Sequence, residues 1–129
     1  MQAKETVLVA EDEDLVRKVI ARALQAHGYR VLEARNGQEA LLVLKRADQP
    51  VDLVITDVIM PEMGGRELAD RVRELNAALP VLYISGYSKD MGTYLQGRPD
   101  SEHFLAKPFD PTDLAKKVRE ILDQAQRAG

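Results

Sequence analysis

The 129-residue chain has no cysteine and no long hydrophobic segment. The lack of cysteine excludes disulfide bonds and thiolate chemistry, and it fits a reducing compartment. No apolar stretch approaches the roughly 20 residues that a membrane-spanning helix needs. The N-terminus, which is charged at Lys4 and Glu5, does not have the pattern of a signal peptide. We therefore expect a cytoplasmic protein without membrane insertion.

The net charge of the chain is −3, whereas nucleic-acid-binding domains usually have an excess of basic residues. Direct binding to nucleic acid is therefore not expected. Apolar residues make up 45% of the chain and charged residues 30%, as in ordinary globular proteins. There is no linker, internal repeat or low-complexity segment. We expect a single domain over residues 1–129, with a core at about 6–125.

Short apolar runs alternate with amphipathic segments along the whole chain. The expected strands cover about 6–10, 29–33, 51–56, 81–85 and 103–106. Their continuous apolar character is typical of parallel strands that are buried on both faces. Right-handed crossovers between such strands predict a three-layer α/β fold of five βα units.

Five helices are expected between and after the strands. The first ends at Gly28 and has an apolar face made by Leu15, Val16, Val19, Ile20, Ala23 and Leu24. Asn36 caps the second, Gly64 and Gly65 open the third, and the fourth covers about 89–97. Asp110 and Pro111 begin the last helix. We expect its charged residues, Lys116, Lys117, Arg119 and Glu120, to be its solvated side.

Charged residues follow three of the expected strands. The acidic cluster Glu11 to Asp14 comes after the first strand, Asp57 after the third and Lys107 after the fifth. Ligands of open parallel sheets bind beyond the carboxyl ends of the strands. A nucleotide-binding protein would place a glycine-rich turn after the first strand, whereas the acids found here would repel a bare phosphate. A divalent cation must therefore bind first.

Magnesium suits such a site, because it takes carboxylate oxygens and keeps several waters. A carboxylate beside the metal can then act as a nucleophile towards a phosphoryl group. Lys107 and the hydroxyl of Ser85 would help to neutralise the charge of the transition state. Each residue also has an ordinary structural explanation as a helix cap, a turn residue or a solvated strand end. Four features follow successive strands: the acidic cluster Glu11 to Asp14, Asp57, Ser85 and Lys107. Their occurrence in this order favours phosphate chemistry over those structural explanations.

From residue 6 to about 125 the chain resembles the receiver domains of two-component response regulators. The resemblance lies in the pair Glu11-Asp12, the segment from Thr56 to Gly65, the hydroxyl of Ser85 and the motif Lys107-Pro108-Phe109. It implies a flavodoxin-like fold with strand order 2-1-3-4-5. It also implies a phosphoacceptor in a two-component system or phosphorelay, which promotes its own phosphorylation and is not an enzyme acting on external substrates.

The resemblance assigns a role to each site residue. Asp57 would accept a phosphoryl group from the phosphohistidine of a sensor histidine kinase or histidine phosphotransfer domain. Asp12, Asp57 and the backbone carbonyl of Ile59 would bind Mg²⁺, for which Mn²⁺ can substitute, and Glu11 would act on the metal mainly through water. Lys107 would pair with Asp57, and the Lys107–Pro108 peptide bond would be cis.

The same resemblance implies a switch. Ser85 would move towards the phosphoryl group, and the ring of Phe104 would turn inward after it. This movement would change the surface formed by 89–97, 103–106 and the last helix, through which a phosphorylation-dependent dimer could form.

The chain departs from the usual pattern of the family in two of these residues. Glu11 stands where Asp is commoner, and Phe104 stands where many members have Tyr. Ile59 and Tyr87 offer no polar helper for the hydrolytic water, so we expect slow self-dephosphorylation, which a phosphoryl lifetime of seconds would contradict. We expect Val58, Ile59, Met60 and Met63 to pack around the acceptor instead of forming an exposed apolar binding loop.

Two other functions remain open at this stage. An aspartyl-phosphate phosphatase would carry a second Asp two residues after the first, where this chain has Ile59. A receiver-like binding module that works without phosphorylation would not need Asp12, Asp57 and Lys107. The stretches 56–68 and 84–87 resemble receivers of hybrid sensor kinases, and the chain could be a stand-alone regulator or part of a longer protein.

Overall fold

A computed structural model describes residues 5–48, 50–60, 62–85 and 103–128 of the chain. Five strands form one parallel sheet in the order β2-β1-β3-β4-β5, which confirms the expected flavodoxin-like topology. Its strands are β1 (Thr6–Ala10), β2 (Arg30–Ala34), β3 (Leu53–Asp57), β4 (Val81–Ser85) and β5 (Phe104–Ala106). Of the expected strands, the second, third and fifth begin one or two residues later than the sequence indicated.

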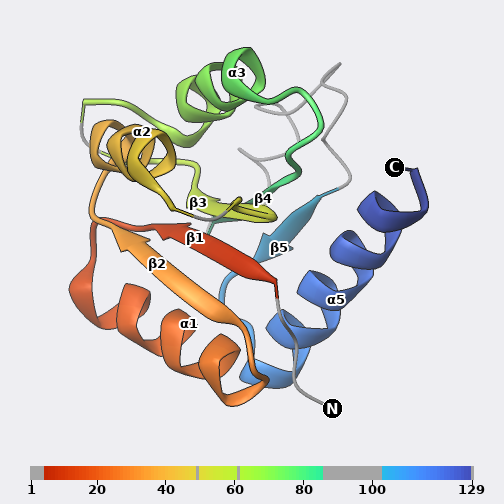
Figure 1. Cartoon of the computed structure of the whole chain (residues 1–129). Helices are drawn as coiled ribbons and strands as arrows, with labels where there is room; N and C mark the ends of the chain where they lie inside the picture. The colour runs from red at the N-terminus through yellow and green to blue at the C-terminus, as the bar shows by residue number, and fades with distance from the viewer. Residues whose placement is uncertain (1–4, 49, 61, 86–102, 129) are drawn as a thin grey trace.

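The described helices lie on both faces of this sheet (Figure 1). They are α1 (Asp14–Ala26), α2 (Gly37–Arg46), α3 (Gly65–Leu75) and α5 (Pro111–Ala128). Helices α1 and α5 cover one face, and α2 and α3 cover the other (Figure 1). The helix expected at 89–97 lies outside the described residues. None of the helices in the described ranges combines the length and apolarity that a membrane span requires.

The helix ends follow local rules that the sequence already contained. The side chain of Asn36 accepts a hydrogen bond from the backbone N–H of Glu39, at 2.8 Å, and Asp110 caps α5 in the same way through Asp113. Helix α1 ends at the residue before its cap His27, and Gly28 follows with φ 89°. This left-handed conformation is the one that glycine supplies after a helix.

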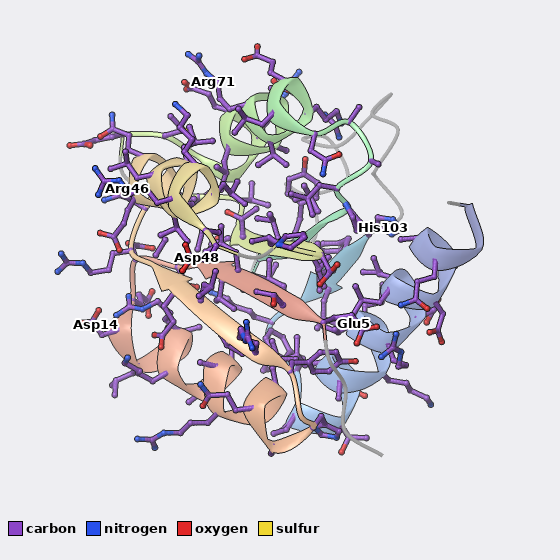
Figure 2. All side chains as sticks on the ribbon, in the orientation of Figure 1. Glu5, Asp14, Arg46, Asp48, Arg71 and His103 are labelled. Carbon is purple, nitrogen blue, oxygen red and sulfur yellow. The ribbon has the colours of Figure 1, made fainter. Side chains whose placement is uncertain are left out.

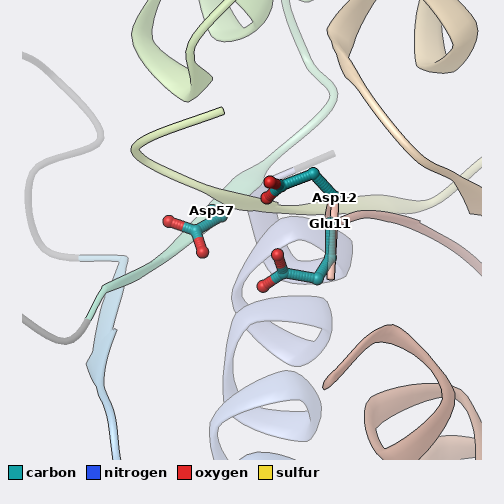
Figure 3. A group of neighbouring side chains, drawn as sticks. All are labelled: Glu11, Asp12 and Asp57. Atoms are coloured by element: carbon teal, nitrogen blue, oxygen red, sulfur yellow. The ribbon is translucent and has the colours of Figure 1, made fainter. Parts of the chain in front are cut away.

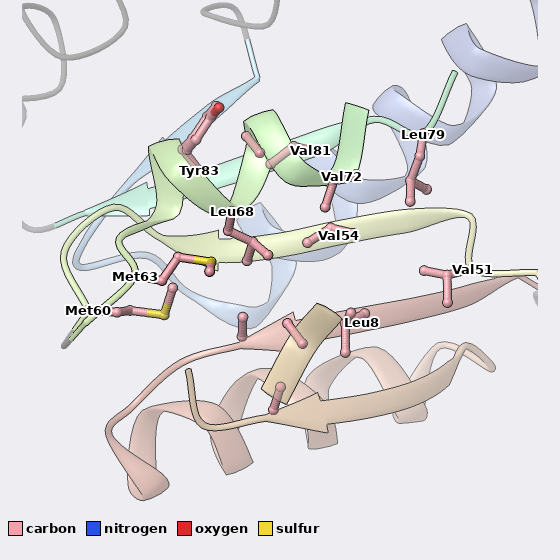
Figure 4. Packing of buried hydrophobic residues seen from close by; sticks show 14 of the residues in the cluster. Leu8, Val51, Val54, Met60, Met63, Leu68, Val72, Leu79, Val81 and Tyr83 are labelled. Atoms are coloured by element: carbon pink, nitrogen blue, oxygen red, sulfur yellow. The ribbon is translucent and has the colours of Figure 1, made fainter. Parts of the chain in front are cut away.

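Apolar side chains fill the space on each side of the sheet. The cluster under α2 and α3 contains Leu8, Val54, Leu68 and Val72 (Figure 4). The cluster under α1 and α5 contains Val9, Ile55, Leu114 and Val118. Every residue of β1, β3 and β4 is buried, as two-sided coverage of a parallel sheet requires. The strand ends that carry the expected site are therefore rigidly placed.

The apolar face predicted for the first helix was partly wrong. Leu15 is 83% exposed and Val19 is 60% exposed, whereas the residues of α1 that are buried are Arg17, Ile20, Ala21 and Leu24. The buried stripe includes Ile20 and Leu24, which pack in the apolar core, and Arg17, whose guanidinium is held by hydrogen bonds. An arginine can occupy a core-facing position only where its donors are satisfied in this way.

Candidate functional site

The carboxyl ends of β1 and β3 bring three acidic side chains together (Figure 3). Glu11 and Asp12 directly follow β1, and Asp57 is the last residue of β3. One carboxylate oxygen from each of the three lies within 4.8 Å of the others. Their proximity follows from the topology, because β1 and β3 are hydrogen-bonded neighbours in the sheet.

Lys107, which follows β5, reaches into this acidic group. Its ammonium lies 2.9 Å from Oδ2 of Asp57 and 3.2 Å from Oε1 of Glu11, so one cation bridges two of the three carboxylates. Burial disfavours the charged ammonium, but the hydrogen bonds and negative charge of Asp57 and Glu11 outweigh burial and raise the pKa of Lys107. The ammonium therefore stays charged at neutral pH. The Lys107–Pro108 peptide bond is cis, as the resemblance implied.

Glu11 is the most buried acid of the group, with no exposed surface. Its Oε2 accepts a hydrogen bond from the backbone N–H of Glu13 at 3.1 Å. Burial and the neighbouring charge of Asp57 raise the pKa of Glu11 to about 7, although the Glu13 N–H and Lys107 act in the opposite direction. Among the described residues, Lys107 is the one cation that forms an ion pair with this acidic group, and its single charge does not balance the three carboxylates.

Asp57 is fixed from two directions. Its Oδ1 accepts a hydrogen bond from the backbone N–H of Ile59 at 3.1 Å, while Oδ2 faces Lys107. Behind it, the first residue of α3, Gly65, donates its N–H to the carbonyl of Val58 at 2.9 Å. A Cβ atom on Gly65 would collide with the carbonyl oxygen of Asp57, so glycine permits this close approach of α3 to β3.

The two residues assigned to the switch belong to β4 and β5, the strands that follow β3 in the sheet. Ser85 ends β4 and is buried, and its carbonyl accepts a hydrogen bond from the backbone N–H of Lys107 at 2.8 Å. Phe104 is the first residue of β5, is partly buried, and pairs across the sheet with Tyr83. The segment 89–97, which belongs to the same expectation, lies outside the described residues, as does Tyr87, which was expected together with Ile59 to leave self-dephosphorylation slow.

The loop between β3 and α3 packs as expected, except for one residue. Val58, Met60 and Met63 are buried, and the thioether of Met60 lies 3.9 Å from Oγ1 of Thr56 (Figure 4). Ile59, in contrast, is 60% exposed, so the prediction that it packs was wrong. Its backbone N–H donates to Oδ1 of Asp57, so Ile59 contacts the acceptor through its backbone while its side chain is exposed.

Sequence reasoning missed Arg17. It is a charged residue of α1 that is only 6% exposed, and its donors reach Glu33 of β2, Asp14 and the carbonyl oxygen of Glu11. The spacing of Asp14 and Arg17 could have indicated only a surface ion pair. Nothing in the local sequence indicates the distant partner Glu33.

The donor set suits a hard divalent cation. Glu11, Asp12 and Asp57 offer oxygen ligands close to one another, and Asp12 is exposed to solvent, from which hydrated ions arrive. Oxygen ligands together with retained waters are what Mg²⁺ requires. The residues present therefore fit the cation that the sequence predicted.

Comparisons with a family model and with known proteins all indicate the same family. The model of the response regulator receiver domain matches residues 7–119. The chain is 40% identical over 121 residues to the sensor kinase CckA of Brucella abortus, of which it spans only 13%. It is 34% identical over 116 residues to the response regulator receiver protein CpdR of the same organism and spans 95% of that protein. Both matches cover at least nine tenths of this chain.

Solved structures of receiver domains resemble this chain as well. The receiver domain of hybrid histidine kinase CckA superposes with a TM-score of 0.75 at 42% identity, over 91% of this chain and 98% of that one. The chemotaxis protein CheY4 of Vibrio cholerae superposes with a TM-score of 0.77 at 31% identity, over 92% and 98% of the two chains. The fold, the order of acidic and basic strand ends and these matches lead to one conclusion: this chain belongs to the response regulator receiver domain family of two-component signalling.

Proposed function

We propose that the chain is a phosphoacceptor whose Asp57 takes a phosphoryl group from a phosphohistidine in a Mg²⁺-dependent reaction. The observation that carries this proposal is the contact of the Asp57 carboxylate with Lys107, beside the two acids that follow β1. A carboxylate in this position is largely buried, held at both oxygens and reachable from the solvent side of Asp12.

In the proposed reaction an Asp57 oxygen forms a bond to phosphorus while the phosphorus–nitrogen bond of the phosphohistidine breaks. The imidazole nitrogen keeps the electron pair of that bond. A divalent cation held by Asp12, Asp57 and the carbonyl of Ile59, with Glu11 acting through water, would neutralise charge on the carboxylates and the phosphoryl oxygens. Lys107 would transfer its hydrogen bond from the Asp57 carboxylate to a phosphoryl oxygen.

Transmission of the signal rests on Ser85 and Phe104. The Ser85 hydroxyl would bind the phosphoryl group, and the ring of Phe104 would turn into the space that this movement opens. The change would appear on β5 and α5 and on the segment 89–97, a surface suited to a phosphorylation-dependent dimer. Phe104 has no hydroxyl, so the coupling would depend on packing alone.

The phosphoryl group should be long-lived. Ile59, two residues after Asp57, presents an exposed aliphatic side chain that can neither orient nor activate a water molecule. We infer slow self-dephosphorylation and no turnover of external phosphate esters.

The donor would be a sensor histidine kinase or a histidine phosphotransfer domain. The likeness to the CckA receiver supports a place within a hybrid sensor kinase, whereas the likeness to CpdR over nearly its full length supports a separate regulator. Both settings use the same chemistry at Asp57.

Intact-mass measurement after incubation with acetyl phosphate tests the proposal. We expect one phosphoryl adduct on the wild type with Mg²⁺, none with chelator, and none on Asp57→Asn under either condition. An adduct of equal yield on Asp57→Asn would refute Asp57 as the acceptor. Absence of any adduct on the wild type, with acetyl phosphate or a phosphorylated histidine phosphotransfer domain, would favour a binding module that works without phosphorylation.

A further inference from the structure

The loop that carries Glu11 and Asp12 is anchored by a buried guanidinium. Arg17 donates from Nη1 to the carbonyl oxygen of Glu11 at 2.9 Å, a contact that is buried. It also donates from Nε to Oε1 of Glu33 at 3.1 Å and from Nη2 to Oδ1 of Asp14 at 2.6 Å. One side chain thus joins β2, the β1–α1 loop and the first turn of α1.

The Glu11 contact bears directly on Asp12. The carbonyl of Glu11 and the amide nitrogen of Asp12 belong to the same planar peptide unit. On its other side, Glu11 is held by its own N–H, which donates to the carbonyl of Ala34 at 3.0 Å. With both of its neighbouring peptide planes fixed, the backbone at Glu11 has little freedom to rotate.

The Asp12 carboxylate depends on this anchoring. It is exposed and makes no hydrogen bond or ion pair with another residue in the described part of the chain. The loop is also not held by a helix cap, because the side chain of Glu13 makes no capping hydrogen bond. Among the described residues, the two peptides that flank Asp12 are each held by one hydrogen bond: Arg17 binds the carbonyl of Glu11, and the N–H of Glu13 donates to Oε2 of Glu11. The direction of the Asp12 carboxylate depends on these two peptides, because its side chain has no described partner of its own.

We propose that Arg17 is a positioning residue for the cation site: by holding the Glu11–Asp12 peptide, it keeps the Asp12 carboxylate close to Asp57. This inference rests on the proposed function, since it assumes that the acidic group binds Mg²⁺. Arg17 acts through the backbone and does not touch the reacting atoms.

Lys18 offers a matched control within the same helix. Its ammonium pairs with Oε1 of the same Glu33 at 3.0 Å, but the side chain is half-exposed and its described partners do not include the β1–α1 loop. Lys18→Met therefore removes one positive charge near Glu33 and leaves the contact to Glu11 intact. Arg17→Met removes the same charge together with that contact and keeps an unbranched apolar stem.

The test is the affinity for Mg²⁺, measured by isothermal titration calorimetry on the wild type, Arg17→Met, Lys18→Met and Asp12→Ala. We expect the Kd of Arg17→Met to rise at least tenfold and that of Lys18→Met to change less than twofold. The Mg²⁺ concentration that half-saturates phosphorylation by acetyl phosphate should rise in Arg17→Met as its Kd does, and should not change in Lys18→Met. A merely structural defect would instead lower the phosphorylation rate at every Mg²⁺ concentration.

A folded Arg17→Met protein with the wild-type Kd would overturn the inference. If Arg17→Met does not fold, Glu33→Gln replaces it, because this change weakens the hold on the guanidinium and keeps the arginine. Its Kd should then rise at least threefold, and an unchanged value would equally overturn the inference. If the wild type binds no Mg²⁺, or Asp12→Ala binds as tightly, the cation assignment itself fails, whatever Arg17 does.

Discussion

At the scale of single residues, the electrostatics of the site converge on Glu11. Its carboxylate is fully buried, faces the negative charge of Asp57 and shares one ammonium with it. The family pattern more often has Asp here, and the longer side chain of Glu11 is what reaches Lys107 and the N–H of Glu13. The ionised form of Glu11 is consequently costly in the absence of a cation.

This cost predicts an unusual dependence of stability on pH. The pKa of Glu11 is about 7 in the folded protein and about 4.5 in the unfolded chain, so between these values the folded state binds more protons. The free energy of unfolding should therefore fall as pH rises from 4.5 to 7, by at most about 3 kcal/mol, and then level off. Urea unfolding at a series of pH values, in the presence of a chelator, measures this dependence.

Glu11→Gln should flatten that pH dependence, and Glu13→Gln, a change at an exposed neighbour, should leave it as in the wild type. Equal slopes in the wild type and Glu11→Gln would show that burial of Glu11 does not govern the stability of the cation-free protein.

The residues of the site could be predicted because their types follow successive strands. Glu11, Asp12, Asp57 and Lys107 lie where the order of strand ends placed them. Arg17 could not be predicted, because its importance comes from a partner 16 residues away on another element. The exposure of Ile59 likewise could not be predicted, because it is one of several apolar residues in the same loop and the others are buried.

At the scale of elements, the junction between β3 and α3 sets the geometry around Asp57. Helix α3 begins at Gly65, directly against the carbonyl of Asp57. Gly64, one residue earlier, has φ −72° and ψ 171°, an extended conformation that any residue adopts. The two adjacent glycines therefore differ in what they tolerate.

We predict that Gly65→Ala disturbs the site and Gly64→Ala does not. The Cβ atom added at position 65 would meet backbone, which cannot move aside as a flexible side chain can, so α3 or the end of β3 must shift. We expect a loss of roughly 1–3 kcal/mol in the free energy of unfolding and at least a tenfold slower phosphorylation. Denaturant unfolding and the rate of adduct formation, measured on both variants, check this; equal behaviour of the two would contradict it.

The elements themselves were predictable to within a few residues, since each has a local signal. Asn36 and Asp110 cap their helices, and the runs that form β1, β3 and β4 are continuously apolar. The face of α1 was not predictable in the same way. The apolar residues Leu15 and Val19 are exposed while the charged residue Arg17 is buried, and an apolar pattern alone does not predict a buried arginine.

The contacts of Arg119 in α5 could not be predicted from the sequence either. It was expected on the solvated side of the helix, yet its guanidinium binds Glu5 at 2.6 Å and Asp123 at 3.0 Å and lies over the ring of Tyr29. Figure 2 shows Glu5 beside α5, at the start of β1. Helix α5 is thus tied to the opposite end of the sheet from the acidic site by contacts between residues far apart in sequence.

At the scale of the whole molecule, the sheet is covered by helices on both faces and has an excess of negative charge at the carboxyl ends of its strands. Among the described residues that form the acidic group there are three carboxylates, and the ammonium of Lys107 contacts two of them, those of Glu11 and Asp57. The two apolar clusters must therefore stabilise the fold against repulsion that a bound cation would relieve. Binding at the site and stability of the fold are linked for this reason.

The linkage predicts that Mg²⁺ raises the melting temperature of the wild type. At a free concentration of one hundred times the Kd, the gain is about 2.7 kcal/mol, which corresponds to a rise of several degrees for a domain of this size. Asp12→Ala should lose most of this rise. Differential scanning calorimetry with and without Mg²⁺ measures it, and an equal rise in both proteins would place the stabilising cation elsewhere.

The measurement that tests the central claim most directly is the location of the phosphoryl group. After reaction with acetyl phosphate and Mg²⁺, reduction with borohydride converts a phosphorylated aspartate into homoserine, and peptide mass mapping then identifies the residue. We predict homoserine at position 57 alone. Modification at Glu11 or Asp12, or a phosphoryl group that resists reduction and maps to Ser85, would contradict the assignment of Asp57 as the phosphoacceptor.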